Sequence, residues 1–269
     1  MTDYVKSSSR EKTELVIPAD RKVADPISYA VSEQSSVKIS SEPGSSATIF
    51  LHIKSPKVDI NVSVGEESSL NIVCLQDAGA KAFTSQKAQV SAGGRVHWHN
   101  VTLGSDVTQD LRSELVGINA ESTVDWVFRA RDKEKQKLSA RNVFSANNGA
   151  GEITLKGVAE ATGKVTCYGM IEIAEQGKGT VTYLTEDVLM LDKTAHVDAV
   201  PGLEIRTNDV KASHSATVSR VTDEDLFYFQ SRGITKSVSR AMYIEGFIGD
   251  LIGRIADVAV RQIVLDAVA

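Results

Sequence analysis

The segment from residue 208 to residue 255 reads NDVKASHSATVSRVTDEDLFYFQSRGITKSVSRAMYIEGFIGDLIGRI, and the sequence pattern of the chain changes within it. Its first part continues the strand-like alternation of the preceding residues. Thr222, followed by the carboxylate of Asp225, then forms a capping-box signature before an apolar run, which predicts that a helix begins there. Gly233 suits the left-handed position after this helix, and Thr235 can cap a second one. The chain is therefore expected to change from strands to helices at the capping box.

The second predicted helix carries an apolar stripe and several glycines. Its apolar residues recur at steps of three and four, which predicts one buried face: Val238, Ala241, Met242, Ile248, Leu251, Ile252 and Ile255. Glycines at positions 246, 249 and 253 interrupt it, and each destabilises a helix interior by about 1 kcal/mol relative to alanine. Two interpretations remain open: a close approach of another backbone, or a break between two shorter helices.

Upstream, residues 36–218 consist of short runs rich in β-branched and aromatic residues, separated by Gly, Ser and Asp. This pattern predicts about a dozen strands. Similar turn phrases carry glycines separated by 28, 24, 34 and 26 residues, at Gly65, Gly93, Gly117, Gly151 and Gly177. A loose repeat of this length is typical of the stacked coils of a solenoid, although a β-sandwich gives a comparable spread.

Three blocks of sequence, in order along the chain, resemble the SufB/SufD family, the scaffold subunits of a machinery that builds iron–sulfur clusters. The first is IPADRKVADPI at residues 17–27, and the second is VDAVPGLEI at residues 197–205. The third comprises His214 within VKASHSATVS, the following DEDLFYFQSRGI and the ending RAMYIEGFIGDLIGRI. The resemblance therefore covers residues 17–255.

The family's core is a right-handed parallel β-helix, so the resemblance favours the solenoid over the sandwich. It implies a mainly β fold with this core over residues 28–221 and a C-terminal α-helical domain over residues 222–269 that stands apart from the rod. Residues 1–27 are expected to hold a tail and a lead-in strand, with a mobile tail up to about residue 14. The alternating charges of RARDKEKQKLSARN, residues 129–142, predict an exposed loop on the side of the solenoid, with a basic docking patch as the alternative.

Composition excludes several classes of function. The net charge is −5 and the pI about 5.6, with Lys and Arg dispersed, so neither nucleic acid nor an anionic membrane is expected as a primary partner. No signal peptide or membrane-spanning apolar run is recognisable, which predicts a soluble cytoplasmic protein. The motifs GxxxxGK[ST], GxSxG and HExxH are absent from the sequence, so we expect a scaffold without catalysis or ATP hydrolysis of its own.

His214 is the principal candidate site residue. It falls on the histidine of the SufD-type signature, and the resemblance implies a position near the interface with a SufB-type partner and a role as an iron or cluster ligand. The chain has Ala212 where the family commonly has a cysteine, and it has no cysteine near Ala195. The two cysteines it does have, Cys74 and Cys167, lie in apolar runs and are expected to be buried. Either a cysteine-bearing partner supplies thiolates to a transient shared cluster, or the chain is a scaffold without direct ligation.

Three other histidines are weaker candidates. His97 and His99 stand two apart, so on a strand both rings project from one face while Trp98 points to the other. They could supply two metal ligands, but the sequence identifies no third. His196, close to Asp198, has the same ambiguity.

The resemblance also implies the partners. The chain would pair, at the C-terminal end of its β-helix, with a SufB-type subunit or with itself, and its helices would dock a SufC-type ABC ATPase. Nucleotide-driven dimerisation of the ATPases would then pull on the helices and open the core interface. Two alternatives remain: a solitary β-solenoid that binds a small molecule or carbohydrate or acts as an isomerase, and a purely structural homodimer.

Overall fold

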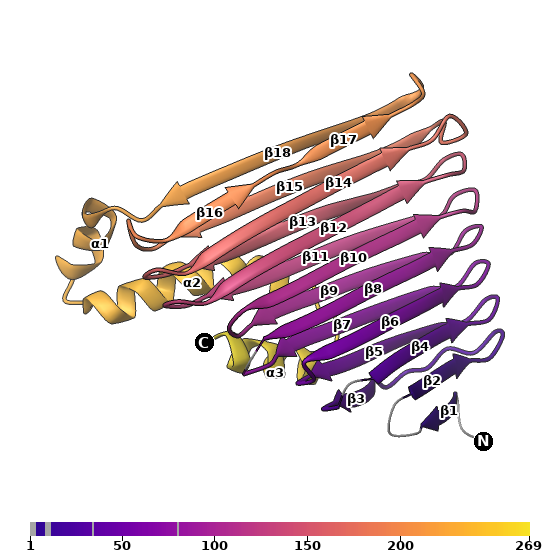
Figure 1. The fold of residues 1–269 in the computed structure, drawn as a ribbon, viewed down its shortest axis with the longest axis horizontal. Helices are drawn as coiled ribbons and strands as arrows, with labels where there is room; N and C mark the ends of the chain where they lie inside the picture. The colour runs from indigo at the N-terminus through magenta and orange to yellow at the C-terminus, as the bar shows by residue number, and fades with distance from the viewer. Residues whose placement is uncertain (1–3, 9–11, 34, 80) are drawn as a thin grey trace.

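The computed structural model describes residues 4–8, 12–33, 35–79 and 81–269, and these form a parallel β-solenoid with helices along one side (Figure 1). From β2 to β16, consecutive strands alternate between a ten-stranded and an eight-stranded sheet, so within this range each strand pairs with the one two places later in the chain. This topology confirms the predicted parallel β-helix with C-terminal helices. The sandwich alternative is wrong, because the coils stack through parallel pairing.

The strands divide between the two sheets as follows. The ten-stranded sheet contains β1 (Val5–Ser8), β2 (Lys12–Ile17), β4 (Ser35–Ser41), β6 (Lys57–Val64), β8 (Ala82–Val90), β10 (Val107–Leu115), β12 (Lys135–Phe144), β14 (Lys164–Ile173), β16 (His196–Ala199) and β17 (Gly202–Ile205). The eight-stranded sheet contains β3 (Ile27–Val31), β5 (Ser46–Ile53), β7 (Ser69–Asp77), β9 (Arg95–Leu103), β11 (Glu121–Ala130), β13 (Ala150–Ala159), β15 (Thr180–Met190) and β18 (Val210–Arg220).

The interior of the rod combines apolar side chains with a polar ladder. On β6, exposed and buried residues alternate strictly, as expected for a strand with one face on the core and one in water. Inside, the amides of Gln86 and Asn100 exchange hydrogen bonds of 2.8 and 3.0 Å. Their partners satisfy groups that would otherwise lose hydration on burial, so the ladder is compatible with a tightly packed core.

The outer face of the eight-stranded sheet is covered by helices α2 (Lys236–Ile252) and α3 (Val258–Val268), and α1 (Asp223–Gln230) packs against α2 beyond the ends of the strands. Burial is therefore nearly continuous along β9, because both of its faces are packed. Ile248, Leu251 and Val264 belong to one apolar cluster with Val101 and Val127 of the sheet. The helices thus lie against the side of the rod (Figure 1), which corrects the expectation that they stand apart from it.

Local signals fixed where the helices begin. Thr222 caps α1, and both hydrogen bonds of the capping box with Asp225 are present. Thr235 caps α2, and Gly233 between the two helices has a φ of +80°. These three predictions are confirmed.

The predicted stripe of α2 is only partly correct. Four of its members are buried against the rod, namely Ile248, Leu251, Ile252 and Ile255. Val238 and Met242 are instead 50% and 44% exposed, and Ile244 takes the buried face in this half of the helix. In the first turns the polar Ser239 is buried while the apolar Val238 is exposed, so the apolar periodicity did not identify the packed side.

Of the three glycines, only Gly253 fits a break between two helices, because Gly246 and Gly249 lie inside the continuous helix α2. A Cβ added at Gly246 or Gly249 would meet nothing within 4 Å. Gly253 ends α2 as its C-cap residue. The structure therefore supports a role in the bend between α2 and α3 for Gly253 alone.

Two segments expected to be irregular form strands. Of residues 129–142, only 131–134 form a turn; Lys135 onward belongs to β12, whose alternating pattern buries Leu138 and Ala140. Of the expected tail, residues 1–3 and 9–11 lie outside the described residues, and β1 pairs antiparallel with β2. Because β2 pairs in parallel with β4, the solenoid begins before residue 28.

No helix in the described part of the chain is long and apolar enough to cross a membrane.

Candidate functional site

His214 lies on β18, the strand that ends the eight-stranded sheet. Among the described residues, β18 pairs only with β15, and His214 stands opposite Leu184, a residue of the interior core. Alternate residues of a strand share a face, so His214 is on the same face as Ala212, which packs on that core. The structure therefore places His214, exposed, at the open C-terminal end of the rod.

A buried carboxyl group lies close to this end and was not identified from the sequence. Glu186 of β15 stands opposite Ala216 in the ladder and is completely buried. Its Oε1 accepts a 2.6 Å hydrogen bond from the N–H of Gly169, while Oε2 has no partner. Burial raises the pKa of Glu186 to about 7, against the opposing effect of backbone hydrogen bonds. Its alternation with Leu184 and Val188 was the sequence signal that could have placed it inside.

Both cysteines are buried in the rod, as predicted. Burial raises the pKa of the Cys74 thiol to about 12, and burial with the nearby Glu186 carboxyl raises that of Cys167 well above its usual range. A thiolate is the form that binds metals. Neither thiol is therefore suited to ligate a cluster, and the missing cysteines at Ala212 and near Ala195 have no replacement in this chain.

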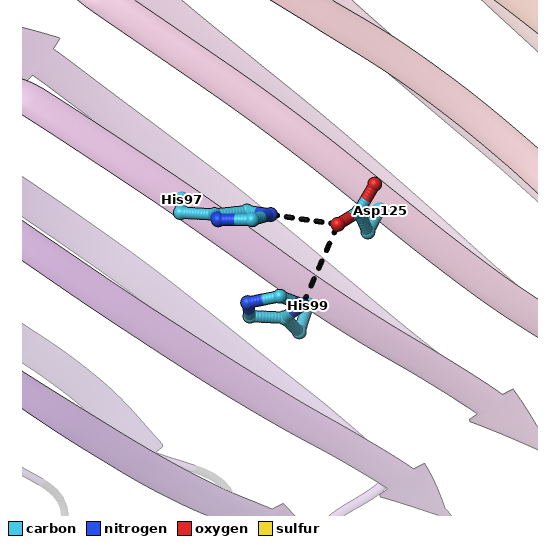
Figure 2. Close-up of side chains that lie close together, drawn as sticks. All are labelled: His97, His99 and Asp125. Atoms are coloured by element: carbon cyan, nitrogen blue, oxygen red, sulfur yellow. Dashed lines mark hydrogen bonds and ion pairs between the residues drawn. The ribbon is translucent and has the colours of Figure 1, made fainter. Parts of the chain in front are cut away.

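A second cluster forms on the outer face of the eight-stranded sheet, where β9 and β11 lie side by side (Figure 2). His97 Nε2 lies 2.7 Å from Asp125 Oδ2, and His99 Nδ1 lies 3.7 Å from the same oxygen. The two imidazole rings are 3.9 Å apart between centroids. Asp125 is the third polar group that the sequence did not identify, because it comes from the next coil.

The cluster is buried at its base and open at one side. The side chains of Asp125 and His99 are 1% and 5% exposed, whereas that of His97 is 30% exposed. Arg254, in the bend after α2, donates from Nη1 to Asp125 Oδ1 at 2.8 Å. Burial, together with the neighbouring His97, lowers the pKa of His99 to about 4. Three elements distant in sequence therefore meet at one carboxylate.

The remaining histidine candidate lies elsewhere. His196 begins β16, and its Nε2 is 3.4 Å from Asp198 Oδ2, with both side chains exposed. His214 and the His97–His99 pair do not share a site either. They occupy opposite faces of the sheet, with three strands between β9 and β18, which separates the strands by about 19 Å.

A family model described as the SufBD core domain of the SUF system for iron–sulfur cluster assembly matches residues 27–247. The chain belongs to the SufBD family. An iron–sulfur cluster assembly SufBD family protein of Mycobacterium bovis is 30% identical over 167 residues, which cover 62% of this chain and 20% of that protein. A relative in Staphylococcus saprophyticus is 26% identical over 192 residues, covering 70% and 41% of the respective chains.

A third SufBD relative, in Staphylococcus haemolyticus, is 24% identical over 208 residues, which cover 76% of this chain and 45% of the relative. The match thus spans less than half the length of each of these relatives. Family membership and a connection with iron–sulfur cluster assembly follow from the comparisons.

Proposed function

We propose that this SufBD protein is a SufD-like scaffold subunit that takes part in building iron–sulfur clusters without catalysing a reaction itself. The observation that carries the proposal is the position of His214 on β18, the free edge of the rod in the described chain. Unpaired strand edges readily accept a strand from another chain. A partner added there would bring its own residues next to His214.

The partner in this proposal is a SufB-type subunit or a second copy of the chain. A neutral imidazole can ligate iron, but a cluster also favours thiolates. Both cysteines of this chain are buried with raised thiol pKa values. Under this proposal a cysteine-bearing SufB-type partner supplies the thiolates to a transient cluster shared across the interface, whereas two paired copies of this chain form a scaffold without direct ligation.

The proposed docking surface for a SufC-type ABC ATPase comprises four exposed apolar residues of α1 and the first half of α2. They are Phe227, Tyr228, Val238 and Met242. Exposed aromatic residues and methionine are enriched at protein interfaces. The rest of α2 is packed against the rod, so force applied to this surface by an ATPase would reach the solenoid through a rigid contact.

Association measured by light scattering tests the partners. The full chain is mixed with a SufC-type ATPase, with and without nucleotide, and separately with a SufB-type subunit. We expect Phe227→Ser to abolish binding of the ATPase, and Val218→Asp, which adds a charge to β18, to abolish pairing. Phe83→Ser is the matched control, because Phe83 is also exposed but lies on β8 of the other sheet.

Two outcomes would contradict these assignments. If no complex with the ATPase forms in any nucleotide state, the docking surface is wrong. If the chain forms a stable dimer by itself but binds neither the ATPase nor the SufB-type subunit, it is a structural homodimer.

A further inference from the structure

The cluster of His97, His99 and Asp125 has the composition of a metal site. One potential ligand atom from each residue lies within 4.8 Å of the other two. Ligands that are each about 2.0–2.2 Å from a first-row metal lie about 3–3.5 Å from one another. The observed separations of 2.7 and 3.7 Å from Asp125 Oδ2 to the two imidazole nitrogens fall on either side of that range. Small rotations of the side chains are enough to close the site around an ion.

A hydrogen-bonding group without a partner gives a second, independent indication. His99 is 4% exposed, and its Nδ1 is buried without a hydrogen-bond partner. This nitrogen faces Asp125 Oδ2 at 3.7 Å, too far for a hydrogen bond. Buried polar atoms normally have a partner. A metal ion between the nitrogen and the oxygen would satisfy both.

Arg254 arranges the carboxylate for this role. It donates to Oδ1 of Asp125, which leaves Oδ2 directed to the two imidazoles. A group that holds a ligand from behind is typical of metal sites, where it fixes the orientation of the first ligand. His97, the most exposed of the three ligands, leaves one side accessible to the ion and to water as a further ligand.

We propose that His97, His99 and Asp125 bind a first-row divalent transition-metal ion of the Zn²⁺ or Fe²⁺ type. Two imidazoles and one carboxylate favour these ions over Mg²⁺ and Ca²⁺, which prefer oxygen ligands only. Arg254 is a positioning residue that acts through Asp125. The proposal rests on this geometry alone and does not depend on the proposed scaffold function.

A direct test uses Co²⁺ as a spectroscopic probe. The full chain, without a histidine tag and stripped by a chelator, is titrated with Co²⁺ while its visible absorption is recorded, and Zn²⁺, Fe²⁺ under anaerobic conditions and Mg²⁺ are added as competitors. We expect one equivalent to bind per chain, to be displaced by Zn²⁺ or Fe²⁺, and to be unaffected by Mg²⁺. Displacement by only one of the two transition metals identifies the preferred ion.

Three variants distinguish residues that contribute to the metal site from a histidine outside it. His97→Ala should weaken Co²⁺ binding at least tenfold, and its partly exposed side chain makes it compatible with folding. Arg254→Gln should weaken binding about tenfold, the size of effect seen for groups behind a ligand. His196→Ala is the matched control, an exposed histidine beside Asp198, and should bind as the unmodified chain does. Absence of saturable Co²⁺ binding, or equal binding by His97→Ala and the control, would overturn the proposal.

Discussion

Replacing Glu186 by Gln should change how the stability of the protein depends on pH. The carboxyl group is completely buried, and Oε2 has no hydrogen-bond partner. Burial disfavours the charged form, which is why its pKa lies at about 7 in the folded chain instead of at the ordinary 4.5. The folded chain therefore holds this proton more tightly than the unfolded chain does.

The sign and size of the effect follow from this difference. Below pH 4.5 the group is protonated in both states, and the folded chain is not penalised. Between pH 4.5 and 7 the unfolded chain loses its proton first, so the free energy of unfolding falls as the pH rises. Each pKa unit corresponds to about 1.36 kcal/mol, so the loss reaches at most about 3 kcal/mol above pH 7.

Urea unfolding followed by circular dichroism between pH 4.5 and 8 measures this loss. Glu186→Gln keeps an acceptor for the N–H of Gly169, but its amide N–H₂ is left unpaired at a pH-independent cost of about 1–3 kcal/mol. The stability of the variant relative to the unmodified chain should therefore rise with pH by up to about 3 kcal/mol. Gln86→Glu is the reciprocal variant, since it adds a carboxyl group to the interior and should introduce a loss of the same sign. A relative stability that stays constant over this range would refute the reasoning.

Three further predictions concern packing and thiol reactivity. In urea unfolding, Leu251→Ala should lower the free energy of unfolding by about 2–5 kcal/mol, and the exposed Val238→Ala should lower it by less than about 0.5 kcal/mol. Equal effects of the two substitutions would contradict the packing of α2 against the rod. Gly151 has a φ of +152°, and an added Cβ would lie 2.0 Å from a carbonyl oxygen of the neighbouring coil. Gly151→Ala should therefore lower the free energy of unfolding by more than about 1 kcal/mol. Gly246→Ala, in open space on a helix, should instead raise the free energy of unfolding by up to about 1 kcal/mol. A smaller destabilisation by Gly151→Ala than by Gly246→Ala would be inconsistent with the packing of the coils. Neither cysteine should react with a thiol reagent in the folded chain, and both should react in urea; fast labelling of the native protein would show that the interior is accessible.

The sequence predicts best what depends on neighbouring residues. The Thr222–Asp225 capping box fixed the start of α1, because its hydrogen bonds join residues three apart. Alternation located the strands for the same reason. Alternation also indicates a strand over residues 135–144, where Leu138 and Ala140 alternate with less buried residues. The alternating charges of this segment nevertheless led to the prediction of an exposed loop.

What could not be predicted depends on how the coils stack. His99 and Asp125 stand opposite each other only because β9 and β11 pair with a register of 26 residues. That spacing lies within the range of the glycine repeat, so a search for ligands one coil away would have found Asp125. Arg254 comes from the other end of the chain, and no local pattern indicates that α2 ends above this carboxylate.

The most direct test of the scaffold function is the yield of iron–sulfur cluster in a complete reconstituted system containing the chain, a SufB-type subunit, a SufC-type ATPase, iron and a sulfur donor. His214→Ala should leave the circular dichroism spectrum and the association with both partners unchanged, because His214 is exposed at the end of the rod. The account predicts that this variant nevertheless lowers the cluster yield, while His196→Ala does not. An unchanged yield with His214→Ala would contradict the assignment of the open end of the solenoid as the site of cluster assembly.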